Sequence, residues 1–282
     1  MINRPKAVFF DIDGTLINRS GGPYADDLQA MELAINAGNF LFLNTGRSFA
    51  NIPAKILDLP LWRGIAAGGG AHILLRESNA GGIFHKTIYH KWIPPKTLMK
   101  ICSWYLENKR QLVLEGEKEC YLIHPSARSF SVRTPVIISG NDEVFKMIST
   151  DYITKLTLEG SAAPGELRLL GKYFKINAFP DYAETIIKGE NKAKAMKIII
   201  KSLGIRRQDS IALGDSVNDI DMIRYAGLGV AVGNASPLLK AAAKAVTANC
   251  GEGGAAQMLR QFVLHQDCRG IKTAPGLNIQ RK

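Results

Sequence analysis

The sequence predicts an α/β protein, in which a doubly wound (Rossmann-like) parallel-sheet core carries an inserted α+β cap domain. Three observations support this prediction. Short, continuous apolar runs alternate with helical segments over the first 80 residues, and such runs are typical of strands that a parallel sheet buries on both faces. The same alternation returns after about residue 183. Between the two, alternating and helical stretches are mixed and prolines are frequent, which indicates an inserted domain of another kind.

The expected elements follow from these patterns in chain order. In the first part of the core, strands are expected at 7–10, 40–43 and 65–67, with helices at 26–37 and 49–57. In the cap, helices are expected at 95–106 and 142–148 and strands at 111–114 and 173–178. The second part of the core should contain strands at 210–213 and 228–232, an edge strand at 245–247, and helices at 191–203, 220–226, 237–245 and 255–264. The predicted borders are 1–82 and 183–265 for the core, 83–182 for the cap, and 266–282 for an irregular tail.

The composition is that of an ordinary soluble globular protein. Of 282 residues, 46% are apolar and 22% charged, and a chain of this length can bury a sizeable core. The net charge of +11 could attract nucleic acid, an anionic membrane or small anionic substrates. Because the basic residues are scattered, we expect no nucleic-acid partner. No apolar run reaches the roughly 18 residues of a membrane span, and no signal-peptide pattern is present. With four cysteines and no C-x-x-C pair, we expect a cytoplasmic protein with reduced thiols and no membrane contact.

Polar residues follow three of the predicted strands directly. The first strand ends in Asp11-Ile12-Asp13-Gly14-Thr15, and the second in Asn44-Thr45-Gly46-Arg47-Ser48. The strand at 210–213 ends in Gly214-Asp215-Ser216-Val217-Asn218-Asp219. In open parallel sheets, ligands bind outside the carboxyl ends of the strands. We therefore expect these three segments to meet at one edge of the sheet.

Four carboxylates belong to these segments: Asp11, Asp13, Asp215 and Asp219. Packing like charges together in a desolvated place is costly unless a cation neutralises them. Mg²⁺ prefers oxygen ligands, so the pattern predicts a magnesium site. The alternative is that each aspartate caps its own turn.

Two further features suggest that a phosphate binds at the same edge. The hydroxyls of Thr45 and Ser48 and the backbone N–H groups of the turn at Gly46 fit phosphate oxygens, although a helix cap would use the same residue types. On a helical projection, Lys192 falls on the apolar face in the first turn of its helix, whereas the other lysines lie on the opposite face. A lysine in that place can reach an anion near the helix start, or it can extend along the surface to solvent.

Together these residues resemble the haloacid dehalogenase-like (HAD) superfamily of hydrolases, and within it the Cof-type phosphatase branch, which carries a large cap. Asp11-Ile12-Asp13-Gly14-Thr15-Leu16 is similar to the first motif, Asn44-Thr45-Gly46-Arg47 to the second, Lys192 to the third, and Gly214-Asp215 with Asn218-Asp219 to the fourth. The sequence departs from the usual family pattern at Gly69-Gly70, Lys192-Ala193 and Glu252-Gly253, none of which changes a chemical group of the site.

The resemblance implies a role for each matching residue. Asp11 would be the nucleophile, and Asp13 the general acid and then the general base. Mg²⁺ would be bound by Asp11, the backbone carbonyl of Asp13 and Asp215, with support from Asp219. The phosphoryl oxygens would be held by Thr45, the turn at Gly46, Lys192 and Asn218.

The implied function is a Mg²⁺-dependent phosphatase that hydrolyses a small phosphorylated metabolite, with a sugar phosphate favoured, through an aspartyl-phosphate intermediate. Two alternatives remain open: a phosphomutase of the same fold, and a sugar-phosphate-binding regulator with vestigial catalysis. Cap residues would choose the substrate. The polar candidates in the cap are His85, His90, His124, Arg128 and Arg133.

Overall fold

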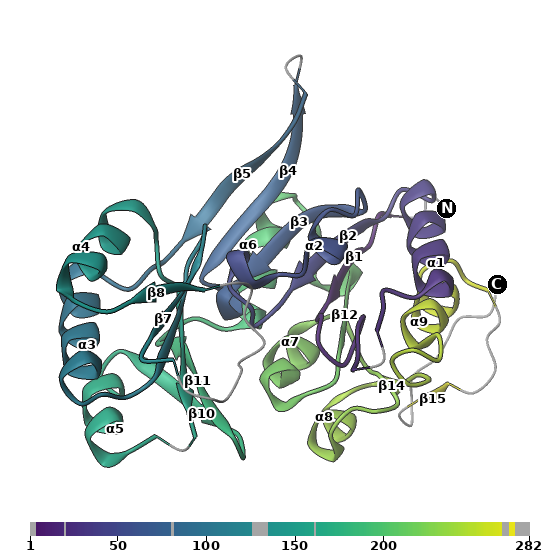
Figure 1. The fold of residues 1–282 in the computed structure, drawn as a ribbon. Coiled ribbons are helices and arrows are strands. Elements are labelled where there is room, and N and C mark those ends of the chain that lie inside the picture. The colour runs from purple at the N-terminus through teal and green to yellow at the C-terminus, as the bar shows by residue number, and fades with distance from the viewer. Residues whose placement is uncertain are drawn as a thin grey trace.

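The computed structural model describes residues 4–19, 21–79, 82–125, 135–160, 162–266 and 271–273. These residues form two sheets, a nine-stranded sheet and a six-stranded sheet, each with helices packed against it (Figure 1). We call the smaller one the cap sheet. No helix in the described ranges combines the length and apolarity that a membrane crossing requires.

The nine-stranded sheet is parallel through its centre. From edge to edge its strands are β15 (Lys272–Thr273), β14 (Ala245–Val246), β13 (Leu228–Ala231), β12 (Ser210–Gly214), β1 (Ala7–Phe10), β2 (Phe40–Asn44), β3 (Trp62–Ala67), β4 (His72–Asn79) and β5 (Gly82–His90). Strands β14 to β3 run parallel, whereas β15 pairs antiparallel with β14, β4 with β3, and β5 with β4. The apolar run of β1 is fully buried at the centre, as expected for a strand covered on both faces.

Helices cover both faces of this sheet, so the fold is doubly wound as predicted. On one side α1 (Ala25–Asn36) packs against α9 (Gly254–Phe262), and on the other α7 (Ile220–Tyr225) packs against α6 (Lys192–Ser202) and α8 (Pro237–Ala242) (Figure 1). The expected helix at 49–57 is divided by Pro53 into a 3₁₀ turn, η1 (Phe49–Asn51), and α2 (Ala54–Leu57). Further 3₁₀ turns are η2 (Gly68–Gly70), η3 (Arg207–Asp209) and η4 (Val217–Asp219).

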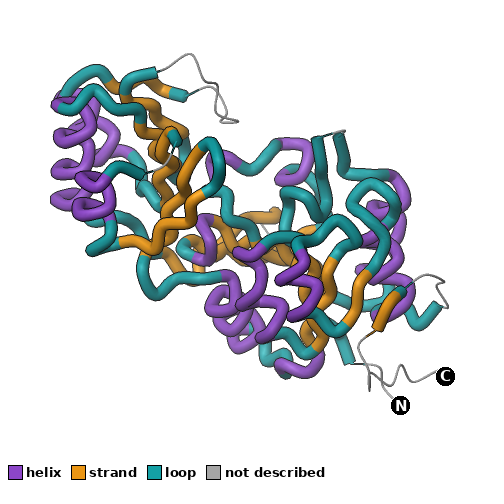
Figure 2. Tube along the Cα trace, turned by 90° about the horizontal axis from the view of Figure 1, so that it is seen from below, coloured by secondary structure: helices purple, strands orange, loops and turns teal. Residues whose placement is uncertain are grey.

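The cap sheet has helices on one face. Its strand order is β10 (Phe174–Ala178), β11 (Tyr182–Ile187), β9 (Lys155–Glu159), β6 (Leu112–Glu115), β7 (Cys120–Ile123) and β8 (Val136–Ile138). Figure 2 shows its helices, α3 (Pro95–Glu107), α4 (Asn141–Thr150) and α5 (Pro164–Leu170), on the side away from the larger sheet. Leu112, Leu114, Leu156 and Leu158 join the buried cluster beneath these helices. Because strand residues alternate between faces, the residues between these leucines point toward the larger sheet.

One expectation about the C-terminal part was wrong. Strand β14 is not an edge strand, because β15 pairs with it antiparallel through Ala245 and Thr273. Residues 272–273 of the tail form a short strand, whereas most of the remaining tail lies outside the described residues.

At the other edge of the large sheet, the hairpin β4–β5 extends it to His90. The domain borders at 82/83 and 182/183 stay a prediction, since strand pairing does not by itself define a domain.

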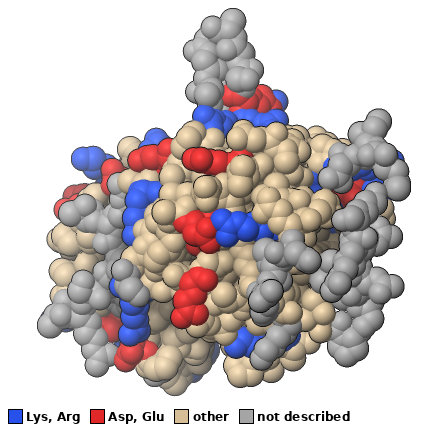
Figure 3. Space-filling model, turned by 90° about the vertical axis from the view of Figure 1, so that its right-hand side faces the viewer, with Lys and Arg blue, Asp and Glu red and all other residues tan. Residues whose placement is uncertain are grey.

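The surface mixes charges of both signs. Figure 3 shows basic and acidic side chains interleaved on the face that carries α1 and α9. Arg260 on α9, for example, makes an ion pair with Asp26 on α1. On this face the described basic side chains form no continuous field.

Candidate active site

The three predicted polar segments meet at the carboxyl edge of the large sheet. In the register of the central strands, Phe10 is the partner of both Leu43 and Leu213. The next residues of these strands therefore lie level with one another, and Asp11 N–H donates to the Leu213 carbonyl at 3.1 Å. The prediction that the segments share one edge is confirmed.

Lys192 points into this edge from the start of α6. The helix is capped by Asn191, whose side chain accepts a hydrogen bond from Lys194 N–H. The Asn44 amide donates to the Lys192 carbonyl at 3.0 Å and so ties the helix start to the end of β2. The Lys192 ammonium is buried and donates to Asp11 Oδ1 at 2.6 Å and to Asp219 Oδ1 at 2.5 Å. Burial alone would lower the pKa of Lys192, but these two carboxylates raise it above its usual range, so the lysine stays charged.

Asp219 folds back beneath its own loop. Its Oδ2 accepts from the backbone N–H groups of Asp215 and Ser216, both at 3.1 Å. A side chain at Gly214 would prevent this, because its Cβ would lie 2.7 Å from the Asp219 side chain. Asp219 thus orients its own loop through Oδ2 and Lys192 through Oδ1.

Three aspartates form a group that fits a divalent cation. Asp11, Asp215 and Asp219 each offer a carboxylate oxygen, and these oxygens lie within 4.8 Å of one another. Within the described part of the chain, the buried Asp215 Oδ1 has no hydrogen-bond partner. Burial, together with the neighbouring carboxylates, raises the pKa of Asp11 well above its usual value and that of Asp215 to about 7. One lysine therefore does not balance the negative charge, and the residues fit the oxygen-rich site that Mg²⁺ prefers.

The Asp13 carboxylate lies outside this group. It accepts two hydrogen bonds from Arg47, from Nε at 2.7 Å and from Nη2 at 2.8 Å, while Arg47 also donates to the Asn51 carbonyl at 2.9 Å. The Asp13 side chain is 52% exposed and so faces the open side of the site. Arg47 stands in the second motif, but the sequence did not suggest this contact. The acid–base role of Asp13 and the metal contact of its carbonyl stay predictions.

The predicted phosphate-binding residues lie around the same edge. Thr45 is buried, and its Oγ1 accepts from Arg47 N–H at 3.1 Å. A Cβ at Gly46 would lie 3.7 Å from the Asn218 amide nitrogen, and Asn218 Oδ1 is 3.5 Å from the Lys192 ammonium. The structure therefore brings together Thr45, Gly46, Asn218 and Lys192, while their contacts with phosphate stay a prediction.

A cleft of about 1550 Å³ lies between this edge and the cap sheet. Its core side includes Asp11, Asp13, Thr45, Arg47, Asp215 and Asn218, and its cap side includes Val113, Glu115, Lys155, Thr157, Tyr182 and Glu184. The cap residues come from the helix-free face of the cap sheet, where register pairs Glu115 with Lys155 and Thr157 with both Val113 and Glu184. Of these strands, the sequence patterns predicted only the one at 111–114, and they did not predict the polar face that the strands present.

A polar contact joins the two sides of the cleft, because the core residue Asn51 donates through its amide to Glu115 on β6 at 3.0 Å. Within the cap side, Glu115 also accepts from the Thr157 hydroxyl at 2.9 Å, and Lys155 donates to Glu184 at 2.7 Å. The described lining does not include His85, His90 or His124, so the structure does not support these histidines as substrate contacts. Arg128 and Arg133 lie outside the described residues.

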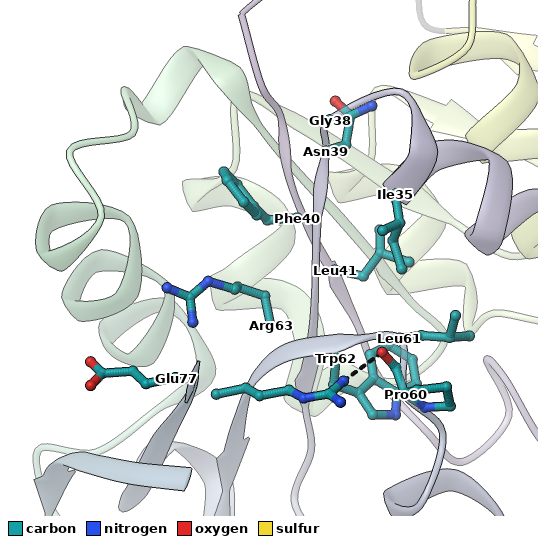
Figure 4. Close-up of a pocket in the computed structure, with 11 residues that line it drawn as sticks. Ile35, Gly38, Asn39, Phe40, Leu41, Pro60, Leu61, Trp62, Arg63 and Glu77 are labelled. Atoms are coloured by element: carbon teal, nitrogen blue, oxygen red, sulfur yellow. Dashed lines mark hydrogen bonds between the residues drawn. The ribbon is translucent and has the colours of Figure 1, made fainter. Parts of the chain in front are cut away.

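A second cavity lies at the opposite end of the strands. It has a volume of about 660 Å³ and is lined by the starts of β2 and β3, including Phe40 and Trp62 (Figure 4). Arg76, which also lines it, donates to the Pro60 carbonyl at 2.6 Å. Because it is at the amino ends of the parallel strands, it is separate from the carboxylate edge.

The residues 8–259 match the family model of the haloacid dehalogenase-like hydrolases. This protein belongs to that family. It is 28% identical to a 5-amino-6-(5-phospho-D-ribitylamino)uracil phosphatase, YcsE, of Bacillus subtilis, over 92% of this chain and 96% of that protein. A second phosphatase of the same name and organism, YitU, is 24% identical over 93% of this chain and 99% of that protein.

Solved structures of HAD proteins share the fold. The structure of a HAD subclass IIB sugar phosphatase, BT4131, superposes with a TM-score of 0.74 at 27% identity and covers 91% of this chain and 98% of that one. The resemblance to the Cof-type HAD hydrolases and the predicted fold class are thereby confirmed. The phosphatases among the relatives support phosphatase activity for this HAD hydrolase.

Proposed function

We propose that this protein is a Mg²⁺-dependent phosphatase that hydrolyses a small phosphorylated metabolite through an aspartyl-phosphate intermediate on Asp11. The observation that carries this proposal is the Asp11 carboxylate at the end of the central strand, held 2.6 Å from a buried lysine and beside two further aspartates. A nucleophile next to a fixed positive charge is what phosphoryl transfer requires.

In the proposed reaction, a carboxylate oxygen of Asp11 and the ammonium of Lys192 have different roles. A carboxylate oxygen of Asp11 would attack phosphorus, forming the Asp11–phosphorus bond while the bond from phosphorus to the substrate oxygen breaks. Water would then attack phosphorus, releasing inorganic phosphate and restoring the carboxylate. The Lys192 ammonium, which its two carboxylates keep protonated, would oppose the charge on the phosphoryl oxygens throughout.

Asp13 is suited to proton transfer by its position. Its exposed carboxylate borders the cleft and accepts two parallel hydrogen bonds from the planar guanidinium of Arg47. Such a two-point contact holds the carboxylate in one orientation. It would protonate the departing alcohol and then accept a proton from the attacking water. Asp11, Asp215 and the carbonyl of Asp13 would hold Mg²⁺, with Asp219 in support; the ion, when bound, neutralises phosphoryl charge.

A phosphorylated sugar or polyol is the substrate class that we favour. The names of the relatives specify a phospho-D-ribityl compound and a sugar phosphatase, and the cap side of the cleft offers carboxylate, hydroxyl and ammonium groups that can bond hydroxyls. We also propose that the protein acts in the cytoplasm on a small molecule and not on nucleic acid. The free, buried thiols of Cys102, Cys120 and Cys250 support a reducing compartment.

The test is a phosphatase assay on metal-stripped protein with p-nitrophenyl phosphate, with and without Mg²⁺, followed by a panel of phosphorylated metabolites. We expect Mg²⁺-dependent phosphate release and a preference in kcat/KM for sugar or polyol phosphates. Interconversion of hexose 1- and 6-phosphates without phosphate release would instead indicate a phosphomutase. Tight binding of a sugar phosphate without turnover would indicate a regulator.

A further inference from the structure

Two histidines and a glutamate meet where the two sheets join. His72 begins β4 and His90 ends β5, and the two are cross-strand partners. Their rings stack with centroids 3.9 Å apart and planes 13° from parallel. Glu117, in the turn between β6 and β7 of the cap sheet, places Oε2 3.9 Å from His90 Nδ1. One potential ligand atom from each residue lies within 4.8 Å of the others.

The two imidazoles have hydrogen-bonding capacity that is not used. His72 is 1% exposed, and among the described residues the buried nitrogens His72 Nδ1 and His90 Nε2 have no hydrogen-bond partner. A buried polar atom without a partner is unfavourable, so such atoms call for an explanation. Burial lowers the pKa of His72 to about 3 and also lowers that of His90, and a neutral imidazole is the form that binds metal.

We propose that His72, His90 and Glu117 bind a divalent transition-metal ion of the zinc class at the junction between the large sheet and the cap sheet. Two imidazole nitrogens and one carboxylate oxygen are a ligand set that zinc accepts, with water in a fourth position. Magnesium, by contrast, prefers oxygen ligands. The site is therefore chemically distinct from the aspartate group at Asp11 and does not depend on the proposed phosphatase function.

The surroundings position the glutamate. The Asp151 carboxylate accepts hydrogen bonds from the backbone N–H groups of Glu117, Lys118 and Glu119, at 3.0 to 3.3 Å, and thereby fixes the turn. A side chain at Gly116 could not fit, since its Cβ would lie 2.3 Å from Asp151 Oδ2. Burial and the charge of Asp151 raise the pKa of Glu117, so a nearby cation would stabilise its ionised form.

Aromatic side chains lie beside the histidines. The rings of Trp92 and Tyr152 lie 5.2 Å and 5.3 Å from that of His90. Because the rings of His72 and His90 are nearly parallel, their lone pairs do not yet converge. Binding through both requires one ring to turn about its χ2 torsion, which is a soft torsion for histidine.

Binding at this place would connect the two sheets. His90 is the last residue of the large sheet before the chain enters the cap, and Glu117 belongs to the cap. An ion shared by the two would restrict movement of the cap sheet relative to the cleft. It would also stabilise the folded chain, because the unfolded chain does not hold the three ligands together.

The test is a calorimetric titration of the metal-stripped full chain with Zn²⁺ in excess Mg²⁺, repeated with Co²⁺ and followed by its visible absorption. We expect one tight Zn²⁺ site per chain, a Zn²⁺-dependent rise in Tm, and Co²⁺ bands typical of nitrogen ligation. In His72→Phe and in Glu117→Gln the Zn²⁺ affinity should fall at least about tenfold. His72→Phe keeps an aromatic ring for the stack, and Glu117→Gln, on the partly exposed turn, provides an independent variant should the first fail to fold.

Matched controls separate this site from other metal-binding groups. Glu119→Gln changes a carboxylate in the same turn, and His85→Asn changes a histidine on the same strand as His90; both should keep wild-type Zn²⁺ affinity. Asp215→Asn should lose binding at the aspartate group while keeping the tight Zn²⁺ site. The proposal is overturned if the wild-type chain binds no Zn²⁺ in excess Mg²⁺, or if His72→Phe and Glu117→Gln both bind as tightly as the wild type.

Discussion

Two buried lysines lie on opposite sides of the same cleft, each between two carboxylates, yet their surroundings differ. Lys192, on the core side, lies between Asp11 and Asp219. Lys155, on the cap side, lies between Glu115 and Glu184. In both cases the carboxylates raise the pKa of the lysine above its usual range, although burial opposes this. The two lysine–carboxylate groups look alike. They differ in how many hydrogen-bond donors and positive charges surround each carboxylate.

On the cap side, Lys155 and several neutral hydrogen-bond donors together stabilise the Glu115 carboxylate. Burial alone would raise the pKa of Glu115, but Lys155, with the Asn51 and Thr157 side chains, holds it below its usual value. On the core side, Asp11 is next to Asp219 and Asp215, and its pKa is raised well above its usual value by burial and by these charges. An unbalanced carboxylate group can accept a cation and a phosphate, whereas a balanced one stabilises the contact between cap and core.

The largest expected effect is that of Asp11→Asn. An amide cannot form the proposed aspartyl phosphate, so kcat/KM on p-nitrophenyl phosphate should fall at least about a thousandfold. Glu115→Gln, which alters a buried carboxylate of the cap side, should keep activity within about tenfold, since it removes no reacting group. The mechanism is wrong if Asp11→Asn, checked for folding by circular dichroism, retains substantial turnover.

Asp13→Asn should lower kcat by about a hundred- to ten-thousandfold on alkyl phosphates, because general acid catalysis is lost. The loss should be smaller on p-nitrophenyl phosphate, whose leaving group needs no proton. Rates on the two substrate types, measured side by side, provide the check. Equal losses on both would contradict the acid role of Asp13.

Lys192→Met and Lys155→Met compare the two lysines directly. Lys192→Met leaves Asp11 and Asp219 buried without their cation, so the free energy of unfolding without Mg²⁺ should fall by about 3–5 kcal/mol, and kcat/KM should fall about a hundredfold or more. Lys155→Met should cost about 1–3 kcal/mol, because Glu115 keeps its other donors. Urea unfolding and the phosphatase assay measure both quantities. If the Lys155 variant lost activity as completely as the Lys192 variant, the distinction between the two sides of the cleft would fail.

Gly214→Ala and Gly116→Ala test two glycines that make room for an aspartate. The added Cβ would lie 2.7 Å from the Asp219 side chain in the first and 2.3 Å from Asp151 Oδ2 in the second, so each should destabilise the fold by about 1–3 kcal/mol. Gly214→Ala should also lower kcat/KM, because Asp219 orients Lys192. Gly116→Ala should leave kcat near the wild-type value. An unaffected kcat/KM in Gly214→Ala would show that Asp219 tolerates displacement.

The last prediction concerns the pH dependence of stability. The ordinary pKa of Glu115 is 4.5, and its folded-state pKa is lower. Its contribution to stability is therefore present above pH 4.5 and is lost as the pH falls through the folded-state pKa. The difference in unfolding free energy between wild type and Glu115→Gln, about 1.5–3 kcal/mol at neutral pH, should shrink in acid. A difference that is constant from pH 7 to pH 3 would exclude this linkage.

Much of the core could be predicted from local patterns. Continuous apolar runs such as Ala7–Phe10 are typical of strands covered on both faces, and the polar residues after them had to meet once the strands ran parallel in register. The position of Lys192 on the apolar side of its helix was equally local, because helical geometry places each side chain relative to its neighbours. The same reasoning wrongly placed β14 at the edge of the sheet. Its partner β15 is distant in sequence, and local periodicity does not reveal such a pairing.

The order of residues was sufficient to locate the aspartate group and its lysine, because each lies at the end of an element whose type can be recognised locally. Tertiary packing alone decided the rest: the fork of Arg47 on Asp13, the polar face formed by Glu115 and Lys155, and the junction of His72, His90 and Glu117. These contacts join elements that are distant in sequence. Which side chains touch there depends on strand register and on how the cap sheet lies over the core, and a one-residue shift in register would turn a different set of side chains toward the cleft.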